Sequence, residues 1–109
     1  MQALVGEEEI ALTRFQQLEL LQGARDEKEW ILLSDYLDNQ LYLEVGSDTW
    51  QAAARIYFDL RRSGVTVRSP IDCCIAQIAI ENEVLLIHDD RDFEVIAGVV
   101  GLVQRRFPV

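Results

Sequence analysis

Apolar residues recur along the first half of the chain with the period of a helix, and then with the period of a strand. The spacing predicts a helix at 13–23, with Thr13 as its N-cap and Gly23 at its end. A second helix is expected at 26–39, because acidic residues fill its first turn. The short alternating stretch at 40–46 predicts a strand.

The second half of the chain repeats this order with clearer boundaries. An alanine-rich segment at 47–64 predicts a helix capped by Ser47. Another helix is expected at 69–83, with Ser69 as N-cap and a proline at its first position. The apolar run at 84–87 is typical of a short buried strand in a parallel sheet.

A short helix at 93–97 and a final strand at 102–103 are expected to close the chain. Helices that alternate with short apolar strands indicate an α/β sandwich. The sequence contains no repeat, low-complexity tract or linker rich in proline and glycine, so we expect residues 1–109 to form a single domain.

The composition favours a cytoplasmic protein that does not enter a membrane. Half of the 109 residues are hydrophobic, yet no apolar run approaches the ~20 residues that span a bilayer. Cys73 and Cys74 are adjacent, and neighbouring cysteines rarely form a disulfide, so we expect both thiols to be reduced. The net charge of −9 argues against binding nucleic acid through a basic surface. It does not exclude a nucleic-acid enzyme whose acids recruit divalent cations.

Carboxylates gather where the buried strand is expected to end. Asp89, Asp90 and Asp92 follow this strand directly, and ligands of open α/β sheets bind at the carboxyl ends of strands. Asp72 lies in the first turn of the preceding helix, and Glu19 lies beside the apolar stripe of the first helix. Acids that meet at one edge repel each other unless a cation lies among them. Oxygen ligands suit Mg²⁺ or Mn²⁺, which promote phosphodiester cleavage.

Each of these residues also has a simpler interpretation. An acid in a first helical turn, such as Asp72, complements the helix dipole, and Glu19 fits a solvated helix surface. Asp90 or Asp92 could cap the helix that follows them. His88 could be a metal ligand or a base, but a single histidine at a strand end is more often only hydrogen-bonded.

Two stretches of the sequence resemble motifs of a known family. The run SPIDCCIAQIAIENEVLLIHDDRDF at 69–93 resembles the C-terminal signature of PIN-domain ribonucleases. In that signature an Asp opens a helix, and a buried strand precedes an acid-x-acid-Phe element. The run LELLQGARDEKEW at 18–30 resembles the helix that carries the family's Glu, especially in the VapC toxins of toxin–antitoxin pairs. The resemblance extends from about Gly6 to the C-terminus.

This resemblance implies a three-layer α/β/α sandwich with a central parallel sheet and the activity of a Mg²⁺- or Mn²⁺-dependent endoribonuclease toxin. Glu19, Asp72 and Asp90 match the family's acidic positions and would be both catalytic and metal-binding. Asp92 would be a further metal ligand, and His88 would shape the site rather than perform the chemistry. RNA would be the substrate. A cognate antitoxin and a second copy of the chain, in a homodimer, would be the partners.

The sequence departs from the family pattern at its N-terminus. The family begins with an apolar strand that ends in an Asp and lies at the centre of the sheet, whereas this sequence opens with MQALVGEEEI. We therefore expect ~25–30 residues of the pattern to be missing, by truncation or in a degenerate member, so that the activity of this form is open. Another segment or a second chain is then expected to cover the centre of the sheet.

A second hypothesis is a non-catalytic remnant or interaction module that binds an antitoxin. The helices at 26–39 and 47–64 would then matter most. The negative charge of the chain would attract a basic segment of such a partner. Metal binding and cleavage that depend on Asp72 and Asp90 would distinguish the enzyme from the interaction module.

Two other enzyme classes fit the sequence poorly. A phosphoryl-aspartate receiver domain needs a lysine after its last strands, but the only lysine is Lys28. A phosphatase of the haloacid-dehalogenase type carries its Asp-x-Asp motif at the start of its fold, whereas only 17 residues follow Asp92 here.

Overall fold

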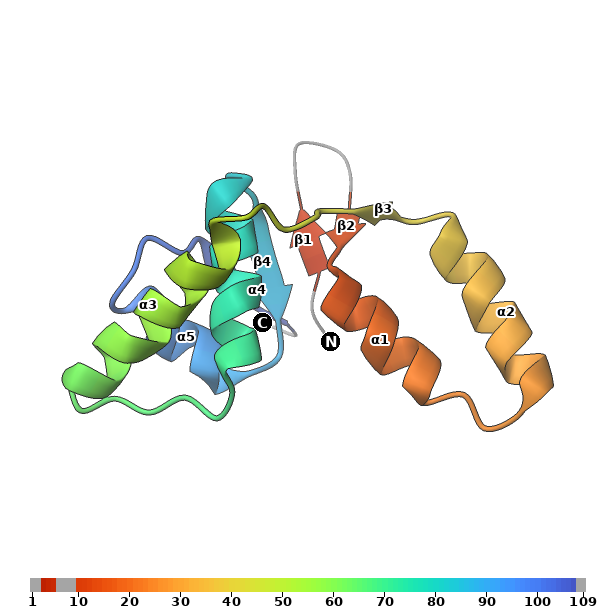
Figure 1. Cartoon of the computed structure of the whole chain (residues 1–109), viewed down its shortest axis with the longest axis horizontal. Coiled ribbons are helices and arrows are strands. Elements are labelled where there is room, and N and C mark those ends of the chain that lie inside the picture. Colours follow the sequence, from red (N-terminus) through yellow and green to blue (C-terminus); the bar gives the residue numbers. More distant parts are fainter. Residues whose placement is uncertain (1–2, 6–9, 108–109) are drawn as a thin grey trace.

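The computed structural model of the chain describes residues 3–5 and 10–107, and its elements are shown in Figure 1. After a short N-terminal pair of strands, one or two helices precede each further strand. The helices in the described ranges are α1 (Arg14–Gln22), α2 (Glu27–Asp38), α3 (Thr49–Arg62), α4 (Pro70–Glu81) and α5 (Arg91–Ala97). The strands are β1 (Ala3–Val5), β2 (Ile10–Leu12), β3 (Leu41–Tyr42), β4 (Leu85–His88) and β5 (Gln104–Arg106). The expected α/β class is confirmed.

The strands form one mixed sheet in the order β3-β2-β1-β4-β5. The outer pairs β2–β3 and β4–β5 are parallel, as expected for this fold class. The central strand β1 runs antiparallel to both of its neighbours, so the sheet is not parallel throughout. We did not predict β1 or β2, because strands of three residues are too short for their periodicity to show. The centre of the sheet is thus occupied by a segment of the chain itself.

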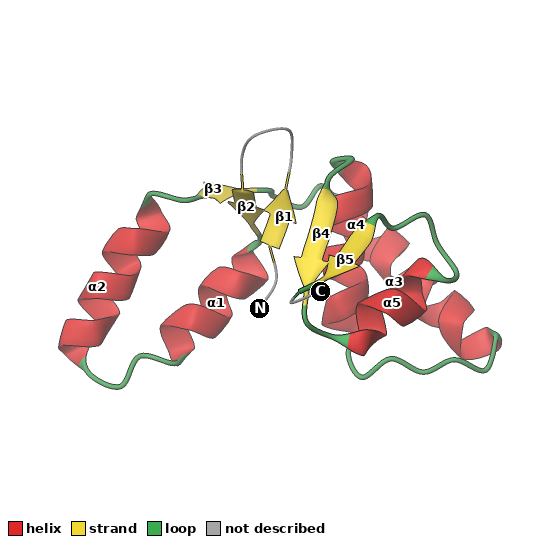
Figure 2. Cartoon of the chain, turned by 180° about the vertical axis from the view of Figure 1, so that it is seen from behind, coloured by secondary structure: helices red, strands yellow, loops and turns green. Residues whose placement is uncertain are grey.

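Helices α3 and α4 pack against each other beside strand β4, and α5 contacts both α4 and β5 (Figures 1 and 2). Helix α4 is apolar on almost every face, as expected of a helix enclosed by its neighbours. Its buried residues are Cys73, Cys74, Ile75, Ala76, Ile78 and Ala79. Leu86 of β4 and Phe93 and Ile96 of α5 complete the core beside them. This packing fixes the end of β4 against the start of α4.

The two cysteines lie inside this core, as expected for reduced thiols. Cys73 and Cys74 are both buried, and neither forms a disulfide. Burial raises the pKa of the Cys73 thiol to about 11, so this thiol stays protonated at neutral pH. Both cysteines therefore serve to fill the core. In the described part of the chain, none of the helices is both long and apolar enough to cross a bilayer.

The hairpin of α1 and α2 extends away from the sheet and from the other helices (Figure 1). The molecule is accordingly elongated, with principal extents of 46 × 33 × 29 Å. Several large apolar side chains of this hairpin are exposed, namely Leu18, Leu20, Trp30, Ile31, Leu32 and Tyr36. An apolar surface of this kind is typical of a region that contacts another protein.

Several boundaries differ from the sequence prediction: the strand expected at 40–46 is limited to Leu41–Tyr42, and the helix expected at 93–97 begins at Arg91. The N-cap of α3 is Asp48 rather than Ser47. The side chain of the next residue explains the shift: Thr49 Oγ1 accepts a hydrogen bond from the Gly46 N–H over 2.9 Å and donates one to Glu81 over 2.8 Å. This buried threonine fixes the start of the helix. The last strand begins two residues later than the predicted 102–103, because the side chain of the residue at 102 is buried in the core instead.

Candidate active site

The end of β4 and the start of α5 place two acids side by side. Asp90 is the N-cap of α5, and its Oδ1 accepts a hydrogen bond of 2.9 Å from the backbone N–H of Asp92. The capping interpretation is therefore correct for Asp90. Capping uses only one carboxylate oxygen, so Oδ2 of Asp90 remains available for another partner.

The start of α4 brings a third acid to the same edge. Ser69 caps this helix by accepting a hydrogen bond of 3.1 Å from the Ile71 N–H, and Pro70 occupies the first helical position. Asp72 consequently lies in the first turn of α4. The start of this helix was predicted correctly, since the cap and the proline are local signals.

Three of the candidate acids converge in space. Asp72, Asp90 and Asp92 each offer a carboxylate oxygen, and these atoms all lie within 4.8 Å of one another. All three residues are intermediate between buried and exposed. We refer to these three residues as the acid cluster. Three carboxylates at this separation repel one another strongly when all are ionised.

The environment of Asp72 reflects this repulsion. Burial, followed by the charges of Asp90 and Asp92, raises the pKa of the Asp72 carboxyl from 3.8 to about 6. Arg68 acts in the opposite direction, and Glu19 adds a smaller upward shift. The position therefore disfavours an unaccompanied negative charge and favours a nearby cation.

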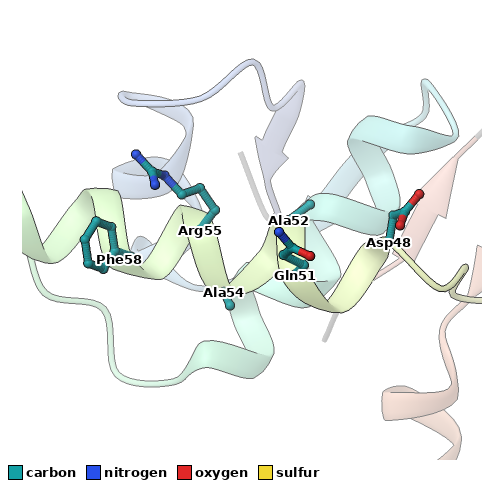
Figure 3. Close-up of a pocket in the computed structure, with 6 residues that line it drawn as sticks. All are labelled: Asp48, Gln51, Ala52, Ala54, Arg55 and Phe58. Atoms are coloured by element: carbon teal, nitrogen blue, oxygen red, sulfur yellow. The ribbon is translucent and has the colours of Figure 1, made fainter.

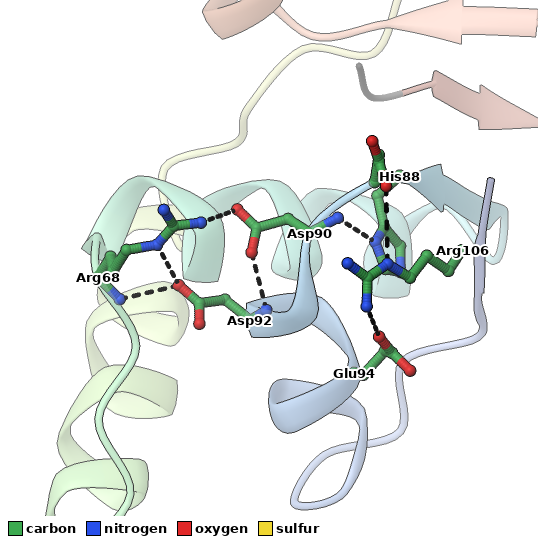
Figure 4. A network of polar contacts seen from close by, with 7 residues as sticks. Arg68, His88, Asp90, Asp92, Glu94 and Arg106 are labelled. Atoms are coloured by element: carbon green, nitrogen blue, oxygen red, sulfur yellow. Dashed lines mark hydrogen bonds and ion pairs between the residues drawn. The ribbon is translucent and has the colours of Figure 1, made fainter. Parts of the chain in front are cut away.

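A single arginine supplies positive charge to the acid cluster (Figure 4). Arg68 lies in the connection between α3 and α4, and its Nη2 is 2.5 Å from Oδ2 of Asp90. Its Nε lies 3.3 Å from Oδ2 of Asp92, and its backbone N–H donates to the same oxygen over 3.0 Å. Our sequence analysis did not identify this residue. Its position directly before the Ser69 cap was the only available signal.

The other candidate acids lie outside the acid cluster. Glu19 is exposed on α1 and is not among the residues whose oxygens converge, although its charge still reaches Asp72. Asp89 faces Arg106 instead, with Oδ1 3.6 Å from its Nε. Arg106 also pairs with Glu94 of α5 over 3.0 Å, and this contact ties β5 to α5 (Figure 4).

His88 is fully buried at the end of β4 and positions Asp90 through a hydrogen bond from the Asp90 backbone. Its Nε2 lies 2.6 Å from Oε1 of Gln104, and its Nδ1 accepts a hydrogen bond of 3.1 Å from the Asp90 N–H. Because the glutamine oxygen can only accept, Nε2 carries the proton, an assignment that follows from the hydrogen-bond network. Both ring nitrogens are engaged in the fold. This geometry agrees with a residue that shapes the site.

The donor set of the acid cluster is made of carboxylate oxygens alone. The imidazole of His88 is occupied by Gln104 and Asp90, and both thiols are buried in the core. Oxygen donors without thiolate or imidazole suit hard divalent cations such as Mg²⁺ or Mn²⁺. The residues present therefore fit a divalent metal site.

A large surface hollow lies elsewhere, along the outer side of α3 (Figure 3). It has a volume of about 610 Å³ and is lined by Asp48, Gln51, Ala52, Ala54, Arg55 and Phe58. It contains none of the residues of the acid cluster. A single carboxylate and a single guanidinium in an open hollow do not form a metal site. The acid cluster is the better candidate.

The sequence of the chain matches a known protein family. The PIN domain profile matches residues 1–99 of the chain. VapC ribonuclease Mb1587 of Mycobacterium bovis is 38% identical over 91 residues, in an alignment that covers 83% of this chain and 68% of the relative. Ribonuclease VapC11 of Mycobacterium tuberculosis is similar to the same extent, with 38% identity over the same shares of both chains.

A solved structure agrees in fold. The crystal structure of VapBC2 from Rickettsia felis, bound to a DNA fragment from their promoter, matches with a TM-score of 0.69 and 17% sequence identity. The match covers 88% of this chain and 73% of that chain. The chain belongs to the PIN-domain family and is a VapC-type member of it.

Proposed function

We propose that this protein is a metal-dependent endoribonuclease of the toxin type, which cleaves RNA phosphodiester bonds with Mg²⁺ or Mn²⁺. The observation that carries the proposal is the convergence of Asp72, Asp90 and Asp92 within 4.8 Å at the carboxyl end of β4. Relatives that are 38% identical to the chain are named ribonucleases, and this supports RNA as the substrate class.

The charge of the molecule makes a cation necessary for this activity. The net charge is −9, and the acid cluster would repel the phosphate of an approaching RNA strand. A divalent ion held by the three carboxylates would stabilise the negative charge that develops on the phosphate during cleavage. The acids of this chain would hold that ion. The His88 side chain would keep Asp90 in place by accepting a hydrogen bond from the Asp90 backbone N–H.

Glu19 remains a candidate fourth acid under this proposal. It is exposed on α1, and its negative charge already acts on Asp72. We expect its carboxylate to hold a water molecule that is bound to the metal ion or lies beside the substrate. Replacing Glu19 should therefore reduce cleavage less than replacing Asp72 does.

RNA cleavage by the purified chain tests the proposed function. A structured RNA would be incubated with wild type and with Asp72→Asn in Mg²⁺, in Mn²⁺ and in EDTA. We expect cleavage only with metal, and a loss of at least about 100-fold in the variant, because even outer-shell partners of metal ligands contribute 10–100-fold. Asp89→Asn is the matched control, since this acid follows the same strand but lies outside the acid cluster. Cleavage that persists in EDTA, or in Asp72→Asn, would contradict the proposal.

The exposed apolar side chains of α1 and α2 favour a second function, the binding of a protein partner. The structural neighbour from Rickettsia felis is a VapBC complex, which supports an antitoxin as the partner class. A homodimer would cover the same kind of surface. Sedimentation of the chain alone tests the dimer: we expect the mass of two chains, and a single-chain mass after Leu18→Ser with Leu32→Ser. Val99→Ser, which removes another exposed apolar side chain outside the hairpin, should leave the mass unchanged.

A non-catalytic interaction module is the alternative to the enzyme. It would form the same complexes but would show no metal-dependent cleavage. Intact assembly in Asp72→Asn together with a complete absence of cleavage by wild type would favour this alternative.

A further inference from the structure

Arg68 already acts as a cation within the acid cluster. Its guanidinium contacts both Asp90 and Asp92, and its backbone N–H makes a third contact with Asp92 (Figure 4). No other arginine or lysine of the described part of the chain forms an ion pair with these two acids. Any further cation must therefore share the carboxylates with this residue.

The individual oxygen atoms show where the two cations would meet. Oδ1 of Asp90 accepts the capping hydrogen bond from the Asp92 N–H, so the outward-facing oxygen is Oδ2. That oxygen is the one that Nη2 of Arg68 contacts. Oδ2 of Asp92 accepts both the Nε–H and the backbone N–H of Arg68. A metal ion that uses Oδ2 of Asp90 would compete with the guanidinium for that oxygen.

The burial of these side chains indicates that the guanidinium is easily displaced. The Arg68 side chain is 77% exposed, whereas those of Asp90 and Asp92 are 25% and 14% exposed. The guanidinium thus lies at the outer side of the acids and can move into solvent without repacking the core. An exposed arginine loses less free energy on leaving an ion pair than a buried one does, because water solvates it once it is released. A divalent ion held by three carboxylates gains considerably more.

We propose that Arg68 is an internal counter-cation, which occupies Asp90 and Asp92 in the metal-free protein and competes with the divalent ion for their oxygens. This inference rests on the proposed metal site. It makes Arg68 a residue that sets the metal affinity of the site and keeps the acids together while no metal is bound. Its backbone N–H continues to hold Asp92 after the side chain has moved away.

Metal titration of variants tests this role without any RNA. Mn²⁺ binding would be measured by calorimetry for wild type, Arg68→Gln and Arg68→Lys, all stripped of metal beforehand. We expect Arg68→Gln to bind Mn²⁺ roughly tenfold more tightly than wild type, the size of one charge-assisted contact. Arg68→Lys keeps the charge but loses the forked geometry, so its affinity should lie between the two.

Arg106→Gln is the matched control for net charge. It removes one positive charge close to the acid cluster, but Arg106 pairs with Asp89 and Glu94 rather than with the cluster. Its Mn²⁺ affinity should stay within about threefold of wild type, because exposed charges at this distance are screened by salt. A gain in this control as large as that of Arg68→Gln would overturn the inference, since it would reveal a general charge effect.

The remaining outcomes separate this inference from the proposed function. If Arg68→Gln binds Mn²⁺ as tightly as wild type, or less tightly, the counter-cation role is overturned while the metal site stands. No binding by either protein would overturn both. Binding by Arg68→Gln alone would support both, with a competitor that dominates in wild type. Since the backbone contact to Asp92 survives the substitution, a circular dichroism spectrum equal to that of wild type is expected.

Discussion

The backbone N–H of Asp90 donates a hydrogen bond of 3.1 Å to Nδ1 of the buried His88, and this contact couples the acid cluster to the interior of the protein. The same imidazole reaches Gln104 on the neighbouring strand through its Nε2. The position of Asp90 therefore depends on a side chain of β5 that never touches the acids. Stability and site geometry should change together when this connection is broken.

Gln104→Leu should destabilise the protein by removing the partner of a buried N–H. The His88 Nε2–H would lose its acceptor at a position with no solvent exposure. An unsatisfied buried donor costs about 1–3 kcal/mol, and we expect the free energy of unfolding in urea to fall by this amount. Gln51→Leu, on the exposed side of α3, is the control and should change it by less than about 0.5 kcal/mol. Equal stability of Gln104→Leu and wild type would mean that the contact between the two side chains contributes nothing.

Asp72→Asn should stabilise the metal-free protein at neutral pH. Burial raises the pKa of this carboxyl to about 6, so the folded state favours its protonated form. The contribution of Asp72 to stability is therefore fully present below pH ~4 and is lost as the pH rises through about 6. At pH 7.5 the ionised group costs about 1 kcal/mol, after allowance for solvent screening of a half-buried side chain.

The measurement for this prediction is urea unfolding of both proteins in EDTA between pH 4 and pH 8. The two curves of stability against pH should coincide near pH 4, separate between pH 4 and pH 6, and stay apart at higher pH, with the variant more stable. Asp89→Asn should track wild type across the range, because this acid is exposed and lies outside the acid cluster. A variant that is less stable than wild type at pH 7.5 would show that ionised Asp72 has a favourable partner in the folded protein.

Local signals predicted the helices that build the site, but not the contacts that complete it. Ser69 and Pro70 mark the start of α4 within two residues, and for that reason the position of Asp72 was predictable. The rule that sites form at the carboxyl ends of strands marked this edge as the candidate site, but only the structure shows that Asp72 and Asp90 converge there. Arg68, in contrast, meets Asp90 and Asp92 across 22 and 24 residues of sequence, and no period or cap encodes such a contact.

The same difference between local signals and long-range contacts explains which strands of the sheet were predicted. Strand β4 is a continuous apolar run and was predicted, whereas β1 and β2 exist only because they pair with each other and with β4. A three-residue strand gains its stability from its neighbours rather than from its own sequence. The antiparallel direction of β1 was therefore not accessible from the pattern of apolar residues.

Divalent metal should stabilise the folded protein through the acid cluster. At a metal concentration about 100 times its dissociation constant, a site present only in the folded state adds about 2.7 kcal/mol, or roughly 10 °C in Tm. We expect Mn²⁺ to raise the Tm of wild type at pH 7.5 and EDTA to reverse the gain. Asp90→Asn should lose most of the gain, while Asp89→Asn should keep it, as it lies outside the cluster.

The gain in Tm should also depend on pH. Metal binds the ionised carboxylates, and the raised pKa of Asp72 means that a proton competes with the metal below about pH 6. At pH 5 we therefore expect a smaller shift of the Tm at the same Mn²⁺ concentration. A shift that is equal at pH 5 and pH 7.5 would indicate that Asp72 is not a ligand.

Phe93→Ala should unfold much of the site, because this ring supports it from within the core. Phe93 is fully buried in α5, and its centroid lies 5.0 Å from that of the His88 ring. Truncating a buried phenylalanine costs about 3–5 kcal/mol, through lost transfer free energy and the cavity that remains. Chemical denaturation of the variant should show a loss of this size, whereas the exposed Phe107→Ala should lose less than about 0.5 kcal/mol. If Phe93→Leu restores most of the stability but not the Mn²⁺-dependent gain in Tm, the aromatic ring orients His88 as well as filling space. If both recover fully, the role of the ring is packing alone.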